Sequence, residues 1–160
     1  MKALPILLLN LTLSLAWAFA KGDLTAGRLL EGFILGYIAL ALTGRAIGAG
    51  VYLRKSIALA RLIAFFLKDL VSANLRVAFD IVTPHHYMRP GVVAIPLDVE
   101  SDIEITLMGN LITLTPGTLA LDVAADRRTM YIHSMYIKDP EELRHEIKNG
   151  LEKRILELMR

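Results

Sequence analysis

The chain has 160 residues, of which 54% are hydrophobic and only 21% charged, and its mean hydropathy of +0.49 is unusual for a soluble protein. This length allows one domain, or a membrane segment with one small domain attached. The chain contains no cysteine, which excludes disulfides, cysteine-ligated zinc, iron–sulfur clusters and thiol catalysis. Any redox chemistry around this chain therefore needs a cofactor on another subunit.

The two halves of the chain carry opposite net charge. Residues 1–91 contain ten Lys/Arg against four Asp/Glu, whereas residues 92–160 contain eight Lys/Arg against twelve Asp/Glu. A basic, apolar half followed by an acidic, mixed half indicates a membrane part and a water-facing part. The basic residues are interleaved with aliphatic residues rather than gathered on one polar face, so the sequence predicts no nucleic-acid partner.

Two apolar runs open the chain. Residues 3–20 carry no formal charge and are close to the minimum length of a membrane-spanning helix, about 20 residues. This run also resembles a signal peptide, with Ala18-Phe19-Ala20 as a small-residue cleavage site. The second run, over residues 24–43, follows almost at once and favours a retained helix. The sequence therefore predicts two spanning helices.

The second run contains Gly32 and Gly36, which are four residues apart and lie on one face of a helix. Small residues at this spacing let another helix approach closely in lipid, so they predict a helix-packing face. Glu31 lies beside them. A carboxylate inside a span is costly unless it faces protein or water, which makes Glu31 a candidate for an ion path. Alternatively, Glu31 pairs with Arg28 near the helix end, within reach of the headgroups.

Residues 56–82 predict one long amphipathic helix. Its charged residues fall within an arc of roughly 120°, while most of the remaining face is aliphatic or aromatic. We expect this helix to lie in the membrane interface, since spanning would place several charges at depth. A third span packed against partner subunits is the alternative. The excess of basic residues in the loop before it places the rest of the chain on the cytoplasmic side of a multi-pass membrane protein.

Residues 83–91 interrupt the pattern with Pro84, Pro90 and Gly91 and are expected to be a linker. His85 and His86 within it invite a metal hypothesis. Adjacent histidines point in different directions in most backbones, and no nearby Cys or third His completes a ligand set. The sequence therefore predicts surface histidines in a connector, and neither a metal nor a cofactor.

Residues 92–160 predict a small soluble α/β domain of order β-α-β-β-α. Ser101 and Glu104 have the spacing of a capping box, which begins a helix that should end before Pro116. Asp139 followed by Pro140 predicts the start of the final helix. The expected elements are strands at 92–97, 118–123 and 129–137, with helices from 102 to about 115 and from 140 to about 158. The predicted fold is thus a helical membrane half, residues 1–82, joined to a soluble domain.

This domain lacks a recognisable catalytic constellation. The only histidine on a predicted strand is His133, and its neighbour Ser134 points to the opposite face, so the two do not form a dyad. Arg127 and Arg128 at the expected hairpin tip could hold a phosphate or a lipid headgroup, although Asp126 directly before them favours a solvated turn. The sequence predicts a protein that is not an enzyme.

One segment carries a family resemblance. Its residues are Asn110, Thr113, Thr115, Pro116, Gly117 and Thr118, followed by Leu121-Asp122-Val123, Tyr131-Ile132-His133 and Asp139-Pro140-Glu141. This pattern resembles the E subunit of Mrp-type (multisubunit) monovalent cation/proton antiporters. The resemblance covers nearly the whole chain, with an apolar N-terminal half followed by a small soluble domain. The same subunit type occurs in archaeal membrane-bound hydrogenase and sulfur-reductase complexes.

The resemblance implies an accessory subunit, needed for assembly or activity of a module that exchanges Na+ and H+ across the cell membrane. Its partners would be the other membrane subunits and the lipid bilayer. The resemblance transfers no catalytic residue, because the E subunit is not the one that bears the main proton-pumping lysines and glutamates. The alternative function is a free-standing, membrane-anchored domain that binds a ligand or acts as an adaptor.

Overall fold

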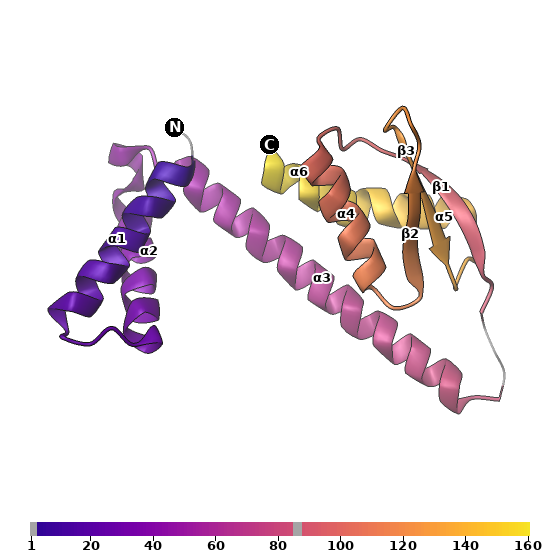
Figure 1. Ribbon diagram of the computed structural model, residues 1–160, viewed down its shortest axis with the longest axis horizontal. Coiled ribbons are helices and arrows are strands. Elements are labelled where there is room, and N and C mark those ends of the chain that lie inside the picture. Colours follow the sequence, from indigo (N-terminus) through magenta and orange to yellow (C-terminus); the bar gives the residue numbers. More distant parts are fainter. Residues whose placement is uncertain (1–2, 85–87) are drawn as a thin grey trace. The chain divides into compact units, whose positions relative to one another are not determined.

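The computed structural model describes residues 3–84 and 88–160, and the side chains of residues 45–47 lie outside that description. The chain divides into two compact units, Met1–Ile57 and Ala58–Arg160, which we call the N-terminal and C-terminal units. Figure 1 shows a helical N-terminal unit and a C-terminal unit that contains a small sheet. The boundary falls inside one long helix, so each unit includes part of it.

The N-terminal unit consists of helices α1 (Ala3–Ala20) and α2 (Ala26–Ile47) and the first residues of α3 (Gly50–Val82). The segments Ala3–Ala20 and Ala26–Gly44 are each long and apolar enough to cross a membrane. The two candidate spans expected from the sequence are therefore present as helices. Gly48 ends α2 in the left-handed conformation (φ 69°), and its N–H donates to the carbonyl of Gly44.

The C-terminal unit combines the rest of α3 with a three-stranded antiparallel sheet and helices (Figure 1). After α3, its elements are β1 (Gly91–Pro96), α4 (Asp102–Leu114), β2 (Thr118–Val123), β3 (Thr129–Ser134), α5 (Pro140–Ile147), the π-helical turn η1 (Lys148–Glu152) and α6 (Lys153–Met159). The strand order is β1-β3-β2, which places β3 in the centre. The tight turn after β2 places β3 directly beside it, as expected for a hairpin.

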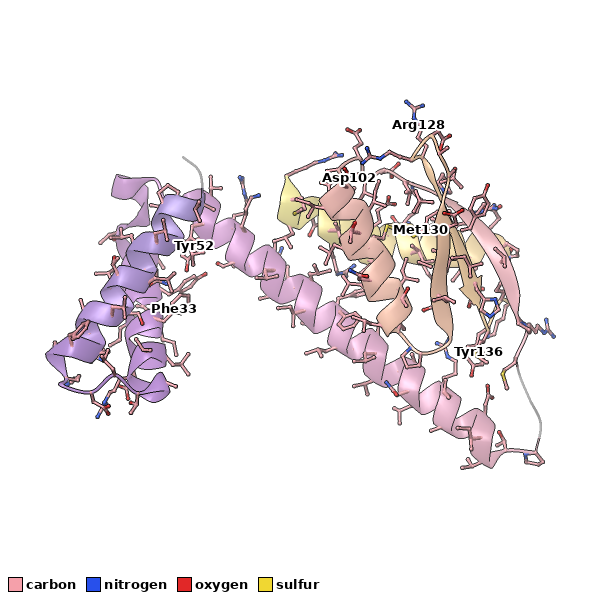
Figure 2. The ribbon with its side chains drawn as sticks, in the orientation of Figure 1. Phe33, Tyr52, Asp102, Arg128, Met130 and Tyr136 are labelled. Atoms are coloured by element: carbon pink, nitrogen blue, oxygen red, sulfur yellow. The ribbon has the colours of Figure 1, made fainter. Side chains whose placement is uncertain are left out.

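One face of the sheet is buried and the other is open. On β3, Met130 and Ile132 are 1% and 0% exposed, whereas Tyr131 between them is 41% exposed. Met130, labelled in Figure 2, belongs to a core that also contains residues of α4, η1 and α6. Alternation with period two is what a strand with one packed face requires. The helices therefore cover a single face of the sheet.

The predicted helix starts of this unit are confirmed. The side chain of Ser101 accepts from the N–H of Glu104, and the Glu104 carboxylate accepts from the N–H of Ser101, which completes the capping box. Asp139 accepts from the N–H of Glu141 at the start of α5, with Pro140 at the first helical position. Both signals are local, so the sequence alone is sufficient to define them.

The final helix predicted from residue 140 to about 158 is present, as the contiguous elements α5, η1 and α6. The turn η1 inserts an extra residue into the helix between α5 and α6. Glu152 ends this turn, is 1% exposed, and accepts from the N–H groups of Asp98 (2.6 Å) and Val99 (3.1 Å) after β1. The wider turn therefore accompanies a buried carboxylate that caps a distant strand end, a contact that helical periodicity does not reveal.

Candidate functional site

Gly32 and Gly36 lie on the face of α2 that packs against α1. A Cβ at Gly32 would come within 2.9 Å of the Cα of Ser14 and the Cβ of Trp17. A Cβ at Gly36 would meet the side-chain oxygen of Asn10. The partner that the glycines face is thus α1 of the same chain, and at Gly32 its backbone lies too close to admit a side chain.

Polar side chains that no sequence motif marks also lie in this helix interface. Asn10 is fully buried and donates from Nδ2 to the Tyr52 hydroxyl (3.0 Å). Ser14, one turn further along α1, donates to the carbonyl of Leu29 (2.6 Å). Figure 2 places Tyr52 within the helical unit. The sequence signal that could reveal them is their spacing, because Asn10 and Ser14 are two polar residues four positions apart in an otherwise apolar run. Gly32 and Gly36, which they face, have the same spacing.

A second polar pair lies in the same unit. The hydroxyls of Tyr37 and Ser56 are 2.7 Å apart, and the rings of Tyr37 and Tyr52 meet edge to face with centroids 5.8 Å apart. Oδ1 of Asn10 is buried without a hydrogen-bond partner among the described residues. Hydrogen bonds between helices in an apolar environment favour one packing arrangement over others. These polar groups therefore fix how α1, α2 and the first residues of α3 pack together.

Glu31, the ion-path candidate, forms an ion pair with Arg28. The Arg28 Nη1 and Glu31 Oε2 atoms are 2.8 Å apart, and the two side chains are 42% and 50% exposed. Trp17 of α1 donates to the same carboxylate at 3.5 Å. In this chain the carboxylate is therefore paired and half-exposed, as the helix-end alternative expected.

The family segment forms the corner between α4 and β2. Thr115 ends the helix and its hydroxyl donates to the carbonyl of Leu111 (3.0 Å). The Thr118 hydroxyl donates to the carbonyl of Ile112 (2.7 Å), a carbonyl in the last turn of α4. The Thr113 hydroxyl accepts from the N–H of Ala120 (3.3 Å). The threonines thus satisfy backbone groups at a helix end, and Asn110 is exposed one turn earlier.

Gly117 completes this corner in the left-handed region, with φ +87°. A Cβ here would come within 3.1 Å of the ring of Tyr136. The carbonyl of Gly117 also accepts from the N–H of Met135 (2.8 Å). The corner therefore requires glycine both for its backbone conformation and for the ring packed on it.

Tyr136 links this corner to α3 within the C-terminal unit (Figure 2). The guanidinium of Arg76 lies 5.4 Å from the centre of its ring. The Tyr136 hydroxyl hydrogen-bonds the carboxylate of Asp80, which raises the pKa of Tyr136 because ionised phenol would lose this bond and face a negative charge. Asp80 is 4% exposed, and its Oδ2 has no partner among the described residues. The family segment thus supports a contact between the domain and the amphipathic helix.

The described residues contain no group of three or more His, Cys, Asp or Glu side chains arranged to hold a metal ion. The His85-His86 pair lies outside the described residues.

The sequence carries a family match over both units. The model of the Na+/H+ ion antiporter subunit family matches residues 10–158. The chain belongs to this family. It is 38% identical over 154 residues to the E subunit of the Na(+)/H(+) antiporter of Bacillus subtilis (strain 168), a match that covers 96% of this chain and 98% of the relative. It is 34% identical over 152 residues to the corresponding E subunit of Alkalihalophilus pseudofirmus, with coverage of 95% and 96%. The resemblance found in the sequence is confirmed.

Solved membrane complexes contain chains of similar structure. A chain of the Mrp complex from Dietzia sp. DQ12-45-1b is 31% identical, with a TM-score of 0.50, and the match covers 64% of this chain and 96% of that one. A chain of the membrane-bound sulfane sulfur reductase, an archaeal respiratory membrane complex, is 26% identical, with a TM-score of 0.56 and coverage of 94% and 96%. Antiporter subunits of this family therefore have structural relatives in both kinds of assembly.

Proposed function

We propose that this protein is an accessory membrane subunit of a multisubunit monovalent cation/proton antiporter module, in which it contributes to assembly and lines part of the ion path. The observation that carries this proposal is the match to an antiporter E subunit over 96% of the chain, which includes the apolar helices as well as the sheet domain. A free-standing, membrane-anchored binding domain would have no reason to resemble that subunit along its entire length. The subunit itself is not catalytic, and the Na+ and H+ move through the complex.

The proposed topology has α1 and α2 spanning the bilayer and α3 lying in its interface, followed by the linker at residues 83–91 and a cytoplasmic domain at 92–160. An apolar stripe on α3 supports the interfacial position. Its residues recur every fourth position and are 45% to 66% exposed: Leu59, Ile63, Leu67, Val71, Leu75 and Phe79. An amphipathic helix buries such a stripe at the boundary between headgroups and acyl chains.

The open face of the sheet is the surface that we propose contacts a neighbouring subunit. Its exposed side chains are largely apolar: Val92 is 57% exposed, Leu119 42%, Leu121 49% and Tyr131 41%. These residues come from all three strands and lie opposite the packed face. Exposed apolar side chains gathered on one face of a sheet are typical of a protein interface. In the proposed assembly, a neighbouring subunit covers this surface.

Isolation of the membrane complex tests this function. The full chain, extracted in mild detergent from its native membrane, is expected to migrate with several further membrane proteins and to support Na+-dependent proton exchange after reconstitution. Substitution of Leu119 and Leu121 by Asp should release it from these partners, whereas Arg128→Gln at the hairpin tip should not. A single species of 17.7 kDa plus detergent from wild-type membranes contradicts the proposal.

Glu31 has the ion-path role in this proposal. Glu31→Gln is expected to reduce Na+-dependent transport by the assembled complex while leaving the amount of complex unchanged. Arg28→Gln is the matched control, because it breaks the same ion pair and leaves the carboxylate in place. Equal transport by the two variants and the wild type would assign Glu31 to a helix-end ion pair only.

A further inference from the structure

A basic groove lies within the C-terminal unit between α3 and the C-terminal helices. It has a volume of about 450 Å³, and its lining includes Arg61, Phe65 and Lys68 from α3 together with Lys153, Arg154 and Glu157 from α6. The lining of the groove therefore contains four cationic side chains and one carboxylate. Such an excess of positive charge in a concave site attracts an anion.

Arg154 is the most constrained of these cations. Its guanidinium stacks on the ring of Phe65 at 3.9 Å and donates to the carbonyl oxygens of Asn149 (3.3 Å) and Gly150 (2.6 Å) in η1. Gly150 permits this packing, because a Cβ there would meet the Phe65 ring at 3.0 Å. The π-helical turn thus holds a charged group in a fixed orientation beside the groove, and such turns are frequent at functional sites.

The other three cations are available to a ligand. Arg61, Lys68 and Lys153 are exposed, and none of them forms a hydrogen bond or ion pair within residues 3–84 and 88–160. Lysine and arginine are the side chains that recognise phosphate oxygens through charge-assisted hydrogen bonds. The groove therefore offers one oriented guanidinium and three free cations to a phosphate group.

The same segment of α3 carries the exposed apolar stripe. Ile63 and Leu67 are 49% and 51% exposed and lie between Arg61 and Lys68 in the sequence. Basic residues that flank a membrane-facing apolar stripe reach the headgroup layer, where anionic lipids concentrate. In sequence, α3 begins only six residues after the candidate span that ends at Gly44. A lipid headgroup is thus the phosphate that lies within reach of this groove.

We propose that the basic groove between α3 and α6 binds the phosphate of an anionic phospholipid headgroup. Lys68 and Lys153 contact the phosphate from opposite sides. Arg154, held in place by Phe65 and η1, adds a fixed positive charge beside it. The inference rests on the membrane-surface position of α3 in the proposed function. A bound headgroup would fasten the C-terminal unit to the bilayer independently of any partner subunit.

The test measures lipid binding to the full chain in a neutral detergent by native mass spectrometry. Short-chain phosphatidylglycerol is compared with phosphatidylcholine of the same chain length and with inorganic phosphate. Phosphatidylglycerol should bind most tightly, and Lys68→Gln and Lys153→Gln should each weaken it about fivefold, since one cation near a lipid surface contributes on the order of 1 kcal/mol. Arg128→Gln, an exposed basic residue at the hairpin tip, is the control and should bind as the wild type does.

Three results would overturn the proposal. Equal binding of the two lipids would remove the requirement for net negative charge, and unchanged affinity in the double Lys68→Gln, Lys153→Gln variant would move the site elsewhere. Inorganic phosphate that binds as tightly as the lipid would make this a site for a soluble anion. Lys68→Arg keeps the charge and should restore binding, which separates loss of charge from loss of fold. Because the assay uses the isolated chain, its outcome is independent of whether the complex transports ions.

Discussion

The backbone conformation at Gly117 determines which residue type the corner between α4 and β2 accepts at this position. Its φ of +87° lies in the region that residues with a Cβ rarely adopt, and the Tyr136 ring occupies the space where a side chain would go. The neighbouring threonines satisfy backbone groups, whereas this glycine permits both the turn and the aromatic contact. The residue thus connects the family segment to the contact between Tyr136 and Asp80 on α3.

Replacement of Gly117 tests this account. Gly117→Ala is expected to destabilise the C-terminal unit by about 1–3 kcal/mol, because an alanine in this conformation is strained and its Cβ meets the ring. Gly109→Ala in α4 is the control: its Cβ would make ordinary contacts at 3.7 Å, and alanine favours the helix by roughly 0.5–1 kcal/mol. Denaturant unfolding of the full chain in detergent gives both values. A Gly117→Ala variant as stable as Gly109→Ala would contradict the assigned strain.

Glu104 makes the stability of the C-terminal unit depend on pH. Its carboxylate accepts from the backbone N–H groups of Ser101 (3.0 Å) and Glu100 (3.1 Å), and these bonds hold its pKa below the ordinary value. A lowered pKa in the folded state means that the unfolded state binds the proton more tightly. The stabilisation is therefore complete above the ordinary glutamate pKa of about 4.3 and is lost as pH falls through the lower folded value.

The corresponding experiment follows the thermal midpoint of the full chain between pH 7 and pH 3. The wild type should lose stability at the acid end, and Glu104→Gln should lose less over the same interval because it carries no proton-linked charge. Glu100→Gln, which removes a neighbouring charge but keeps the Glu104 carboxylate, should follow the wild-type profile. Parallel curves for the wild type and Glu104→Gln would show that the cap carries no pH dependence.

At the scale of elements, the α1–α2 pair is held by close approach at Gly32 and Gly36 and by the polar side chains of Asn10 and Ser14 that face them. Apolar burial does not drive helix association in lipid, so short distances and interhelical hydrogen bonds carry the stability. The two glycines are not equivalent. A Cβ at Gly32 meets backbone atoms of α1, whereas at Gly36 the nearest atom is the end of the Asn10 side chain, which can rotate away.

We therefore expect Gly32→Ala to disrupt the helix pair more than Gly36→Ala does. A clash with backbone forces α1 and α2 apart, at a cost of about 1–3 kcal/mol. Gly27→Ala in the first turn of α2 has nothing within 4 Å of the added Cβ and is the matched control. The amount of correctly folded chain in detergent, and its resistance to thermal unfolding, rank the three variants. Equal behaviour of Gly32→Ala and Gly27→Ala would remove the packing role of Gly32.

Local signals explain which elements could be predicted from the sequence. The caps at Ser101 and Asp139 place helix starts within a few residues, and the alternation after Pro116 identifies a strand. The π-helical turn η1 escaped prediction because its contacts are not local: Glu152 caps the backbone N–H groups of Asp98 and Val99, more than fifty residues away.

The candidate sites also divide into features with a local sequence signal and features that depend on non-local contacts. The spacing of Gly32 and Gly36 can be read directly from the sequence, but the position of Asn10 against Gly36 and Tyr52 requires the packed helices. The basic groove is lined by residues of α3 and by residues of α6, about 85 positions later in the chain, so no local sequence motif predicts it. Sequence patterns thus identify surfaces, and tertiary packing decides which surfaces meet.

At the scale of the whole molecule, the basic first half and the acidic second half suit different surroundings. The candidate spans and the amphipathic helix contain most of the exposed apolar side chains, whereas the sheet domain has a packed core of its own. Neutralisation of basic residues by anionic lipid and solvation of acidic ones in water are both favourable. The charge asymmetry therefore follows the division between apolar, lipid-compatible helices and a sheet domain with a core of its own.

The number of spans can be measured from the sidedness of two loops. With α1 and α2 spanning and α3 in the interface, the connection at Lys21 and the hairpin at Ala125 lie on opposite sides of the membrane; a third span through α3 would bring them to the same side. The chain has no cysteine, so Lys21→Cys and Ala125→Cys each introduce a single reactive thiol at an exposed position. We expect a membrane-impermeant maleimide applied to intact cells to label Lys21→Cys only, and to label Ala125→Cys after the cells are opened. Labelling of both variants, or of neither, in intact cells would require α3 to cross the bilayer, which would bury Arg61, Lys68 and Asp80 at depth and demand partner subunits to pair them.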